Sequence, residues 1–435
     1  MTRITKDVQP EIIKKIVLTL ISLLLVSCVS NGDVQDFSDQ KYDFNLVDTI
    51  KIATWYEEAS PLQEIIGAFN KRYPQVKVEV DYYQSQTFSD FYSQILDSEN
   101  EYDLITITTL DNYSMLAYSN YLADLTMFIE KDNYNLNHFG SLINSLRIED
   151  KLFAIPYRNS VFQLYYNKTL FDQANLEYPD SNMTWEKFRS IAKQLTNGEN
   201  EEKVYGAFFQ SYLDIWVLQA IQAGSSMLDD DLTPFENAIN YTLGLIQDGS
   251  MLSPKEIESM NLVQNGSIKI FGSGKVAMMP MGEWTTWQLL EQSSSLDFEW
   301  AISEMPFSIG GRRNITLGLP ISLGVIEHSK NKEIAWEFIK TMCGPIGAEI
   351  YANNGSIPAL LTSGIREEFI NHSKNVPSIS KFLDTQVESF SFQHPKALEI
   401  REAFTNVFKN VLNGQYSSKE ALEIIVEERK VIFGH

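Results

Sequence analysis

The sequence is poor in cysteine, histidine and positive charge. Its 435 residues include two cysteines and five scattered histidines. Two cysteines are too few for a disulfide framework, and no two histidines have the i, i+4 spacing of a helical zinc site. Lysine and arginine number 35 against 57 acidic residues, which gives a formal net charge of -22. Such an acidic surface repels phosphate backbones, so nucleic-acid binding is disfavoured.

The N-terminus also lacks an apolar run long enough to span a bilayer. Lys14 and Lys15 precede an uncharged run, Ile16 to Val26, which is about half of the roughly 20 residues that a span requires. A short apolar run after positive charges is typical of a secretory signal peptide. We therefore predict that residues 1–27 are a signal peptide and that the protein leaves the cytoplasm.

The next residues resemble the bacterial lipobox. Leu25-Val26-Ser27-Cys28 places a cysteine where cleavage is expected, and in a lipobox that cysteine is lipidated and becomes the new N-terminus. The resemblance implies membrane anchoring through Cys28, because acyl chains contribute about 0.8 kcal/mol per buried methylene. A buried cysteine after an ordinary signal peptide is the alternative. The polar residues up to 48 read as a flexible tether, and Cys343 as a lone buried thiol.

Beyond the tether, strands and helices alternate. Thr49 to Trp55 reads as a strand, Pro61 to Tyr73 as an amphipathic helix, and the alternating Val76 to Tyr82 as a half-buried strand. Another buried strand is expected at Leu104 to Thr108. This order predicts an α/β fold in which helices cover a parallel sheet, and the chain length favours two lobes.

A second unit is expected to start near residue 160. Phe153–Pro156 and Val161–Tyr166 read as two strands flanking a short polar link, and Thr184 as the N-cap of the helix that begins at Trp185. Asn331 is expected to cap a later helix. Further predicted helices are Leu213–Ala223, Pro234–Gln247, Lys396–Leu412 and Ser418–Ile432, and further strands are Lys275–Met279, Phe298–Ile302 and Gly318–Ile326.

Nine short motifs follow one another along residues 50 to 360. They are Thr54-Trp55-Tyr56-Glu57-Glu58, Phe69-Asn70-Lys71-Arg72-Tyr73-Pro74, Tyr121-Leu122-Ala123-Asp124-Leu125, Lys151-Leu152-Phe153-Ala154-Ile155-Pro156-Tyr157, Tyr165-Tyr166-Asn167-Lys168-Thr169-Leu170-Phe171, Met183-Thr184-Trp185, Gly274-Lys275-Val276-Ala277-Met278, Gly282-Glu283-Trp284 and Ser329-Lys330-Asn331-Lys332-Glu333. In this order they resemble family 1 extracellular solute-binding proteins, the group that includes maltose-binding protein and many sugar-binding lipoproteins.

The resemblance implies a two-lobed, periplasmic-binding-protein-like (type II) α/β fold with a hinged cleft between the lobes. Lobe 1 would comprise residues 49–157 and the return 306–355, and lobe 2 residues 158–305. Residues 356–435 would be C-terminal helices, mostly of lobe 2. The chain would cross between lobes near Pro156–Ser160 and near Glu304–Pro306, where a few residues absorb the hinge rotation.

The resemblance also implies the function. The protein would be the extracytoplasmic substrate-binding lipoprotein of an ABC importer, facing the periplasm or the cell exterior. It would bind a mono- or oligosaccharide in the cleft and deliver it to the permease. We expect a monomer without a catalytic residue, cofactor or metal. Aromatic faces would cover the C–H faces of the sugar, and planar polar groups would pair with its hydroxyls.

Candidate ligand contacts follow residue by residue. Trp284 stands after Gly282-Glu283, where family members commonly place a stacking aromatic; a packed lobe-2 tryptophan is the alternative. Glu57 and Glu58 follow the first strand. Asp111 and Asn112 follow the strand at Leu104–Thr108, at the end where open α/β sheets place ligands.

The remaining candidates lie in the second half of the fold. Arg158 and Asn159 stand at the first crossing, and Arg158 departs from the small residue of maltose-binding protein, which puts a maltose ligand in doubt. Tyr212 and Trp216 are further aromatics, with core packing expected for at least one of them. Gly318 is expected to approach the cleft through its backbone.

Two other classes of function stay open. A glycoside hydrolase would need two carboxylates about 5 to 9.5 Å apart. An adhesive lipoprotein would bind no small molecule.

Overall fold

The computed structural model describes residues 49–84, 91–92, 96, 101–263, 266–376, 378–388 and 392–434. The predicted signal peptide, Cys28 and the tether lie outside the described residues. The strands are β1 (Thr49–Trp55), β2 (Lys77–Tyr83), β3 (Leu104–Ile107), β4 (Ala154–Asn167), β5 (Tyr205–Ala207), β6 (Val276–Gly282), β7 (Trp300–Ser303), β8 (Ile315–Val325) and β9 (Gln386–Glu388). The helices of three residues are η1 (Tyr56–Glu58), η3 (Asn200–Glu202) and η4 (Ser293–Ser295).

The longer helices alternate with these strands, as the sequence predicts. They are α2 (Ala59–Arg72), α4 (Leu110–Tyr118), α5 (Thr126–Lys131), η2 (Leu136–Phe139), α6 (Leu142–Ser145), α7 (Lys168–Gln173), α8 (Trp185–Leu195), α9 (Leu213–Trp216), α10 (Leu218–Ala223), α11 (Thr233–Gln247), α12 (Pro254–Ser259), α13 (Gly266–Gly272), α14 (Trp284–Glu291), α15 (Lys332–Met342), α16 (Pro345–Asn353), α17 (Ser363–His372), α18 (Lys381–Asp384), α19 (Ala397–Leu412) and α20 (Ser418–Phe433). None of these described helices combines the length and the apolar character needed to cross a membrane.

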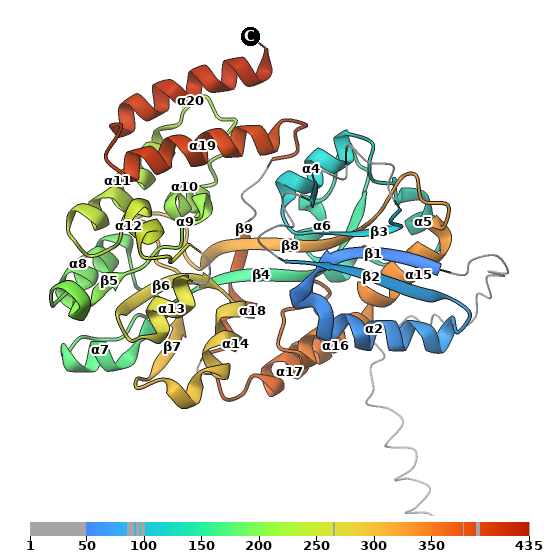
Figure 1. Ribbon diagram of the computed structural model, residues 1–435, viewed down its shortest axis with the longest axis horizontal. Coiled ribbons are helices and arrows are strands. Elements are labelled where there is room, and N and C mark those ends of the chain that lie inside the picture. Colours follow the sequence, from blue (N-terminus) through green and yellow to red (C-terminus); the bar gives the residue numbers. More distant parts are fainter. Residues whose placement is uncertain are drawn as a thin grey trace, which may run out of the picture. The chain divides into compact units, whose positions relative to one another are not determined.

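The strands form one mixed sheet in the order β2-β1-β3-β8-β4-β6-β5 (Figure 1). β1 pairs in parallel with β2 and β3, and β5 pairs in parallel with β6. The predicted parallel pairing is therefore correct at both ends of the sheet. In the middle, β8 runs antiparallel to both β3 and β4. These two long strands carry the chain from one half of the sheet to the other.

β4 corrects one prediction. The segment Ala154–Asn167 is a single strand of 14 residues, not two strands joined by a polar link. Arg158, Asn159 and Ser160 stay in the strand because they pair with Ile321, Pro320 and Leu319 of β8. The register shifts between Pro156 and Arg158. A shift is expected beside Pro156, because proline has no N–H to donate to a ladder.

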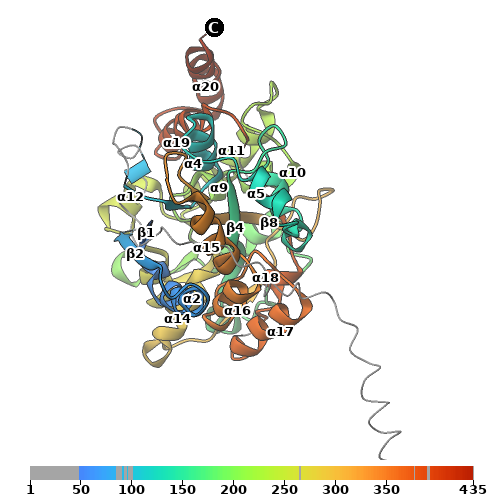
Figure 2. The ribbon, with the colours of Figure 1, turned by 90° about the vertical axis from the view of Figure 1, so that its right-hand side faces the viewer.

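A separate group of packed side chains covers each half of the sheet. We call lobe 1 the half formed by β1–β3 with α2, α4, α15 and α16. Here Phe69 of α2 packs edge-on against Phe338 of α15, with ring centroids 5.1 Å apart, and α2, α15 and α16 lie together (Figure 2). We call lobe 2 the half formed by β5–β7 with α8–α14, α19 and α20. Its core unites Phe162, Trp185, Phe235 and Phe404.

The second passage between the halves runs along β8. Gln222 of α10 donates from Nε2 to the carbonyl oxygens of Pro306 and Ile315, at 2.7 and 3.0 Å. The Phe307 N–H donates to the carbonyl oxygen of Met183. Residues 306 to 315 therefore contact lobe-2 elements before the chain enters β8, and the crossing near Glu304–Pro306 stays a prediction.

The predicted helix boundaries are correct only in part. The Thr184 hydroxyl accepts from the Lys187 N–H at 3.1 Å and caps α8, as predicted. Asn331 precedes α15, but its side-chain amide donates to Asp103 Oδ1 at 3.1 Å and makes no cap. The predicted helix at Leu213–Ala223 is broken at Val217, because the Thr242 hydroxyl donates to the carbonyl oxygen of Trp216 in place of a helical N–H.

Gly318 of β8 provides a test of this packing. A Cβ atom at this position would lie 1.8 Å from Val387 Cγ1 and 3.1 Å from Asn159 Oδ1. Gly318→Ala should therefore lower the free energy of unfolding by about 1 to 3 kcal/mol through overpacking, measured by urea denaturation. Adding Val387→Ala should recover part of the loss. Gly364→Ala, whose Cβ would meet no atom within 4 Å, is the control. Equal stability of the two alanine variants would contradict the packing described.

Candidate functional site

Glu58 is a buried carboxylate next to the strands that cross between the lobes. β1 ends at Trp55, and η1 turns the chain so that the Glu58 side chain points inward with 0% exposure. Its carboxylate accepts from Trp55 Nε1 and from the Tyr351 hydroxyl, both at 2.7 Å. It also pairs with Arg158 Nη1 at 3.4 Å. Three elements distant in sequence therefore converge on one carboxylate.

Arg158 is the cation at the centre of this group. Its side chain is 11% exposed, and its guanidinium carbon lies 5.6 Å from the centroid of the Trp55 ring. Nη1 also donates to the Ser356 hydroxyl at 3.3 Å. Burial lowers the pKa of Arg158, but Glu58 and Glu283 raise it further, so the net pKa shift is upward and the side chain stays charged. Within the described residues, Nε is buried without an acceptor.

Glu283 brings a second buried carboxylate to Arg158 from lobe 2. It lies between β6 and α14, where it accepts from the Ser160 hydroxyl at 3.3 Å and from the Val161 N–H at 3.1 Å. Burial raises the pKa of Glu283 to about 7, although Arg158 and these hydrogen bonds act in the opposite direction. A carboxyl group beside the crossing strands therefore titrates near neutral pH.

Trp284 is held by the residues around it. Its ring lies over Gly282, where a Cβ atom would be 2.0 Å from Trp284 Cζ3. The ring also packs edge-on against Phe162, with centroids 5.2 Å apart and an interplanar angle of 88°. The motif Gly282-Glu283-Trp284 thus combines a small residue under the indole, a buried acid and an indole that is packed on the lobe-2 core and only half-buried.

The other candidates at the crossing are Asn159 and Gly318. The Asn159 N–H donates to the carbonyl oxygen of Ile357 at 2.9 Å, and its side chain approaches the Cα of Gly318 on β8. Glu58, Arg158, Asn159, Trp284 and Gly318 are therefore brought together along β4. Glu57 belongs to the same η1 turn but is exposed.

Asp111 belongs to a second charged group. Arg401 of α19 pairs through Nε with Asp111 Oδ2 at 3.4 Å and through Nη2 with Asp214 Oδ2. Asp111 begins α4 of lobe 1, and Asp214 lies in α9 of lobe 2. The neighbouring Asn112 is buried, and its N–H donates to the capping hydroxyl of Thr109 at 3.2 Å.

The two remaining aromatics differ in exposure. Tyr212 stands just before α9, and its side chain is 42% exposed. Trp216 is 3% exposed and belongs to the lobe-2 core. Core packing is therefore the role that the structure gives Trp216. Within the described residues, no group of His, Cys, Asp and Glu side chains is arranged to hold a metal ion.

Sequence reasoning missed several members of the Arg158 group. Trp55 and Glu283 stand inside motifs that the sequence contains. Trp55 ends β1, and Glu283 directly follows β6, so the signal of each is a polar or aromatic residue at the end of a strand. Tyr351 and Ser356 carry no such signal. Tyr351 lies 293 residues after its partner Glu58 in the sequence. Ser356 lies 198 residues after its partner Arg158.

The shifted pKa of Glu283 predicts a pH-dependent stability. Its folded-state pKa of about 7 lies above the ordinary value of 4.5, so its contribution is complete below pH 4.5 and is lost as pH rises through 7. Gln mimics the protonated acid. Compared with Glu283→Gln, the wild type should lose up to about 3 kcal/mol of unfolding free energy between pH 4.5 and 8, measured by urea denaturation. Glu57→Gln is the exposed control. Parallel pH profiles of wild type and Glu283→Gln would refute the assignment.

Comparisons with known proteins agree with this architecture. Residues 64–375 match a family described as bacterial extracellular solute-binding protein. A sugar transporter structure from Rhizobium etli, in an open conformation, is 26% identical, with a TM-score of 0.75 over 88% of this chain and 99% of that chain. An ABC substrate-binding protein from Listeria monocytogenes, in complex with cycloalternan, is 22% identical, with a TM-score of 0.76 over 89% of this chain and 100% of that chain. The predicted two-lobed α/β fold is therefore confirmed.

The curated relatives are matched over part of their length. A binding protein of Brucella abortus (strain 2308) is 25% identical over 260 residues, which are 56% of this chain and 59% of that protein. The multiple sugar-binding protein of Streptococcus mutans is 23% identical over 256 residues, 54% of this chain and 57% of that protein. This chain thus spans less than two thirds of their length. Because the family match covers more than half of the sequence, the chain belongs to the bacterial extracellular solute-binding proteins.

Proposed function

We propose that this protein binds a carbohydrate between its two lobes and delivers it to the permease of an ABC importer. The names of similar proteins support the ligand class. They include the multiple sugar-binding protein of Streptococcus mutans, the galactooligosaccharide-binding protein of Bacillus subtilis, which is 21% identical over 325 residues, and the Listeria protein in complex with cycloalternan. These relatives are named as binding proteins, which favours binding over the hydrolase and adhesion alternatives.

The observation that carries the proposal is the group of side chains around β4. Trp55 contacts Arg158 from the lobe-1 side. From the lobe-2 side, Glu283 acts electrostatically on Arg158, and Trp284 packs on Phe162 of the same strand. An indole face suits the C–H face of a pyranose, and a guanidinium donates to hydroxyl oxygens. The site thus offers both kinds of contact that a sugar requires.

Some of the candidate residues have surface or polar atoms available for a sugar, and others do not. Trp284 and Tyr212 retain open ring area, and Arg158 and Asn159 each have a polar atom without a partner among the described residues. These four are the contacts we favour, and Trp55 joins them. Trp216 and Gly318 instead pack against protein atoms. We also propose that the lobes meet near residues 157 and 305 and that residues 356–435 belong mostly to lobe 2. The hinge between the lobes would then lie in β4 and β8.

A sugar panel tests the proposal. Bound ligand stabilises only the folded state, by about 2.7 kcal/mol at 100 times Kd, so the cognate sugar should raise the melting temperature in a concentration-dependent manner. Chromatography of the same mixtures should show unchanged sugar. Product formation would support the hydrolase instead, and the absence of any shift across mono- and oligosaccharides would oppose sugar binding.

Trp284 provides the sharpest test of the site. Trp284→Ala should weaken sugar binding by roughly 2 kcal/mol or more, because a stacked aromatic at a binding centre carries a large share of the affinity. Calorimetry would give the affinity, and thermal melting without ligand would give the stability. Trp300→Ala is the control, since Trp300 is also half-buried and packs on Tyr165 of lobe 2. A Trp284→Ala protein that melts early but binds normally would remove Trp284 from the site.

We also propose that Cys28 carries the lipid that holds the protein at the membrane surface. The lipobox-like Leu25-Val26-Ser27-Cys28 motif and the extracellular family support this location. Cys28→Ser should abolish labelling by radioactive palmitate and should release the protein from the membrane fraction or leave it unprocessed. Cys343→Ser, which changes a buried thiol, should label normally. Unchanged labelling of Cys28→Ser would disprove the anchor.

A further inference from the structure

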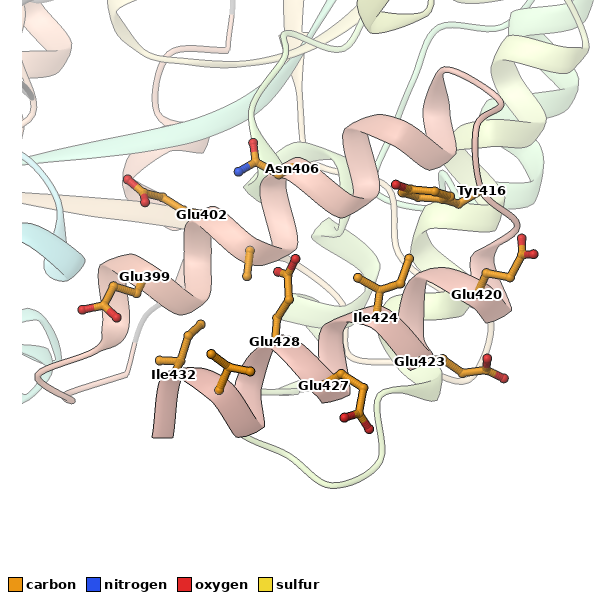
Figure 3. A pocket seen from close by; sticks show the side chains of 12 residues that line it. Glu399, Glu402, Asn406, Tyr416, Glu420, Glu423, Ile424, Glu427, Glu428 and Ile432 are labelled. Atoms are coloured by element: carbon orange, nitrogen blue, oxygen red, sulfur yellow. The ribbon is translucent and has the colours of Figure 1, made fainter. Parts of the chain in front are cut away.

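We propose that the groove between α19 and α20 is a docking surface for a cationic, amphipathic helix of a protein partner. The two helices are joined by residues 413–417 and pack against each other (Figure 3). The groove along them has a volume of about 840 Å³. It shares no residue with the Arg158 group, so this surface is separate from the proposed sugar site.

The floor of the groove is apolar. Ala421 and Ile425 of α20 are buried against the lobe-2 core, as expected for the inner face of a surface helix. On the same helix, Ile424, Val431 and Ile432 line the groove. Ile424 and Ile432 also pack in part against the lobe-2 core, whereas Val431 is 79% exposed. Val431 therefore leaves apolar surface in the groove that a partner helix can cover.

The walls of the groove are acidic. Six glutamates line it, and no lysine or arginine is among the lining residues. Three cations of these helices have their partners outside the groove. Arg401 pairs with Asp111 and Asp214, Lys409 pairs with Glu258, and Arg429 donates to the carbonyl oxygens of Leu228 and Asp229.

Half of the six wall carboxylates have neither an ion-pair partner nor a hydrogen-bond donor among the described residues. Glu399 pairs with Lys396, Glu427 with Lys430, and Glu420 accepts from Ser417 in a capping box. Among the described residues, none forms an ion pair or hydrogen bond with the carboxylates of Glu402, Glu423 and Glu428. Figure 3 shows Glu402 on α19 and Glu423 and Glu428 on α20, so these acids flank the groove from both helices.

Shape and charge together select the occupant. A groove between two packed helices accepts a third helix, and helix-in-groove recognition reads apolar anchors at i, i+3, i+4 and i+7. An apolar stripe with lysine or arginine on both flanks would fill the floor and neutralise the walls. A second copy of this chain, with a net charge of -22, and an anionic membrane surface are both repelled.

The experiment uses a synthetic peptide of about 18 residues with a leucine stripe flanked by lysines, the length of five helical turns. A scrambled peptide of the same composition has the same charge without the stripe. Fluorescence anisotropy at about 0.15 M salt should show saturable binding of the amphipathic peptide to the wild-type protein, with at least tenfold weaker binding of the scrambled peptide. Equal binding of the two peptides would overturn the proposal.

Matched variants locate the contact. The triple variant Glu402→Gln/Glu423→Gln/Glu428→Gln should weaken binding of the amphipathic peptide at least tenfold, and Val431→Ser should weaken it severalfold. The control triple variant Glu130→Gln/Glu177→Gln/Glu291→Gln removes the same charge from exposed glutamates elsewhere and should change binding less than twofold. An equal loss in both triple variants would overturn the proposal, because binding would then follow net charge alone.

Self-association is the remaining competitor for the groove. Sedimentation velocity of the wild-type protein should show a monomer. A dimer that dissociates in the Val431→Ser variant would assign the groove to a second copy and overturn the proposal. Both triple variants should melt at the wild-type temperature within a few degrees, since the removed carboxylates have no partner among the residues that the structure describes.

Discussion

The fold depends on a buried guanidinium in the strand that both lobes share. Moving a charge out of water costs several kcal/mol, and that cost is offset only when carboxylates and hydrogen bonds surround it. Glu58 supplies one carboxylate from the η1 turn, and Glu283 supplies the other from the start of α14. Because removing one partner of such a group leaves an uncompensated charge, the turn after β1, the middle of β4 and the β6–α14 junction are constrained to lie around Arg158.

This constraint has a consequence for ligand binding. Arg158 lies beside the register shift in β4, where the strand pairs with β8, and both strands connect the lobes. A ligand shifts a conformational equilibrium only through different contacts in the two states. In the site proposed above, a sugar hydroxyl that reached Arg158 would compete with Glu58 and Ser356 for the same donors. The proposed site would therefore couple binding to rearrangement of the interlobe contacts through one side chain.

Local patterns in the sequence predict much of the fold. The limits of β1, the start of α8 at the Thr184 cap and the α19–α20 pair follow from apolar period and capping residues, which act over a few positions. Prediction of secondary structure and caps fails where contacts with a segment distant in sequence determine the local conformation. The polar triplet Arg158, Asn159 and Ser160 has the composition of a loop, yet β8 holds it in a strand. Asn331 stands at the N-cap position, yet its side-chain amide donates to Asp103 instead of capping the helix.

The residues of the site also divide into those that local patterns reveal and those that distant segments position. Glu58 and Trp284 were identified because each follows a strand end within a short motif, whereas Tyr351 and Ser356 are positioned by the path of the whole chain. The structure also shows a requirement at Gly282 that the sequence does not reveal: the close approach of the Trp284 ring requires a residue without a Cβ atom.

Arg401 repeats the arrangement of Arg158 in a different part of the fold. It is a partly buried arginine between Asp111 of lobe 1 and Asp214 of lobe 2, and burial lowers its pKa less than the two carboxylates raise it. It belongs to α19, whose Phe404 and Phe408 lie in the lobe-2 core. α19 therefore contacts both lobes. Since one face of α19 is committed to the core and Arg401 to the lobe contact, its outer face beside α20 can meet a partner without disturbing either.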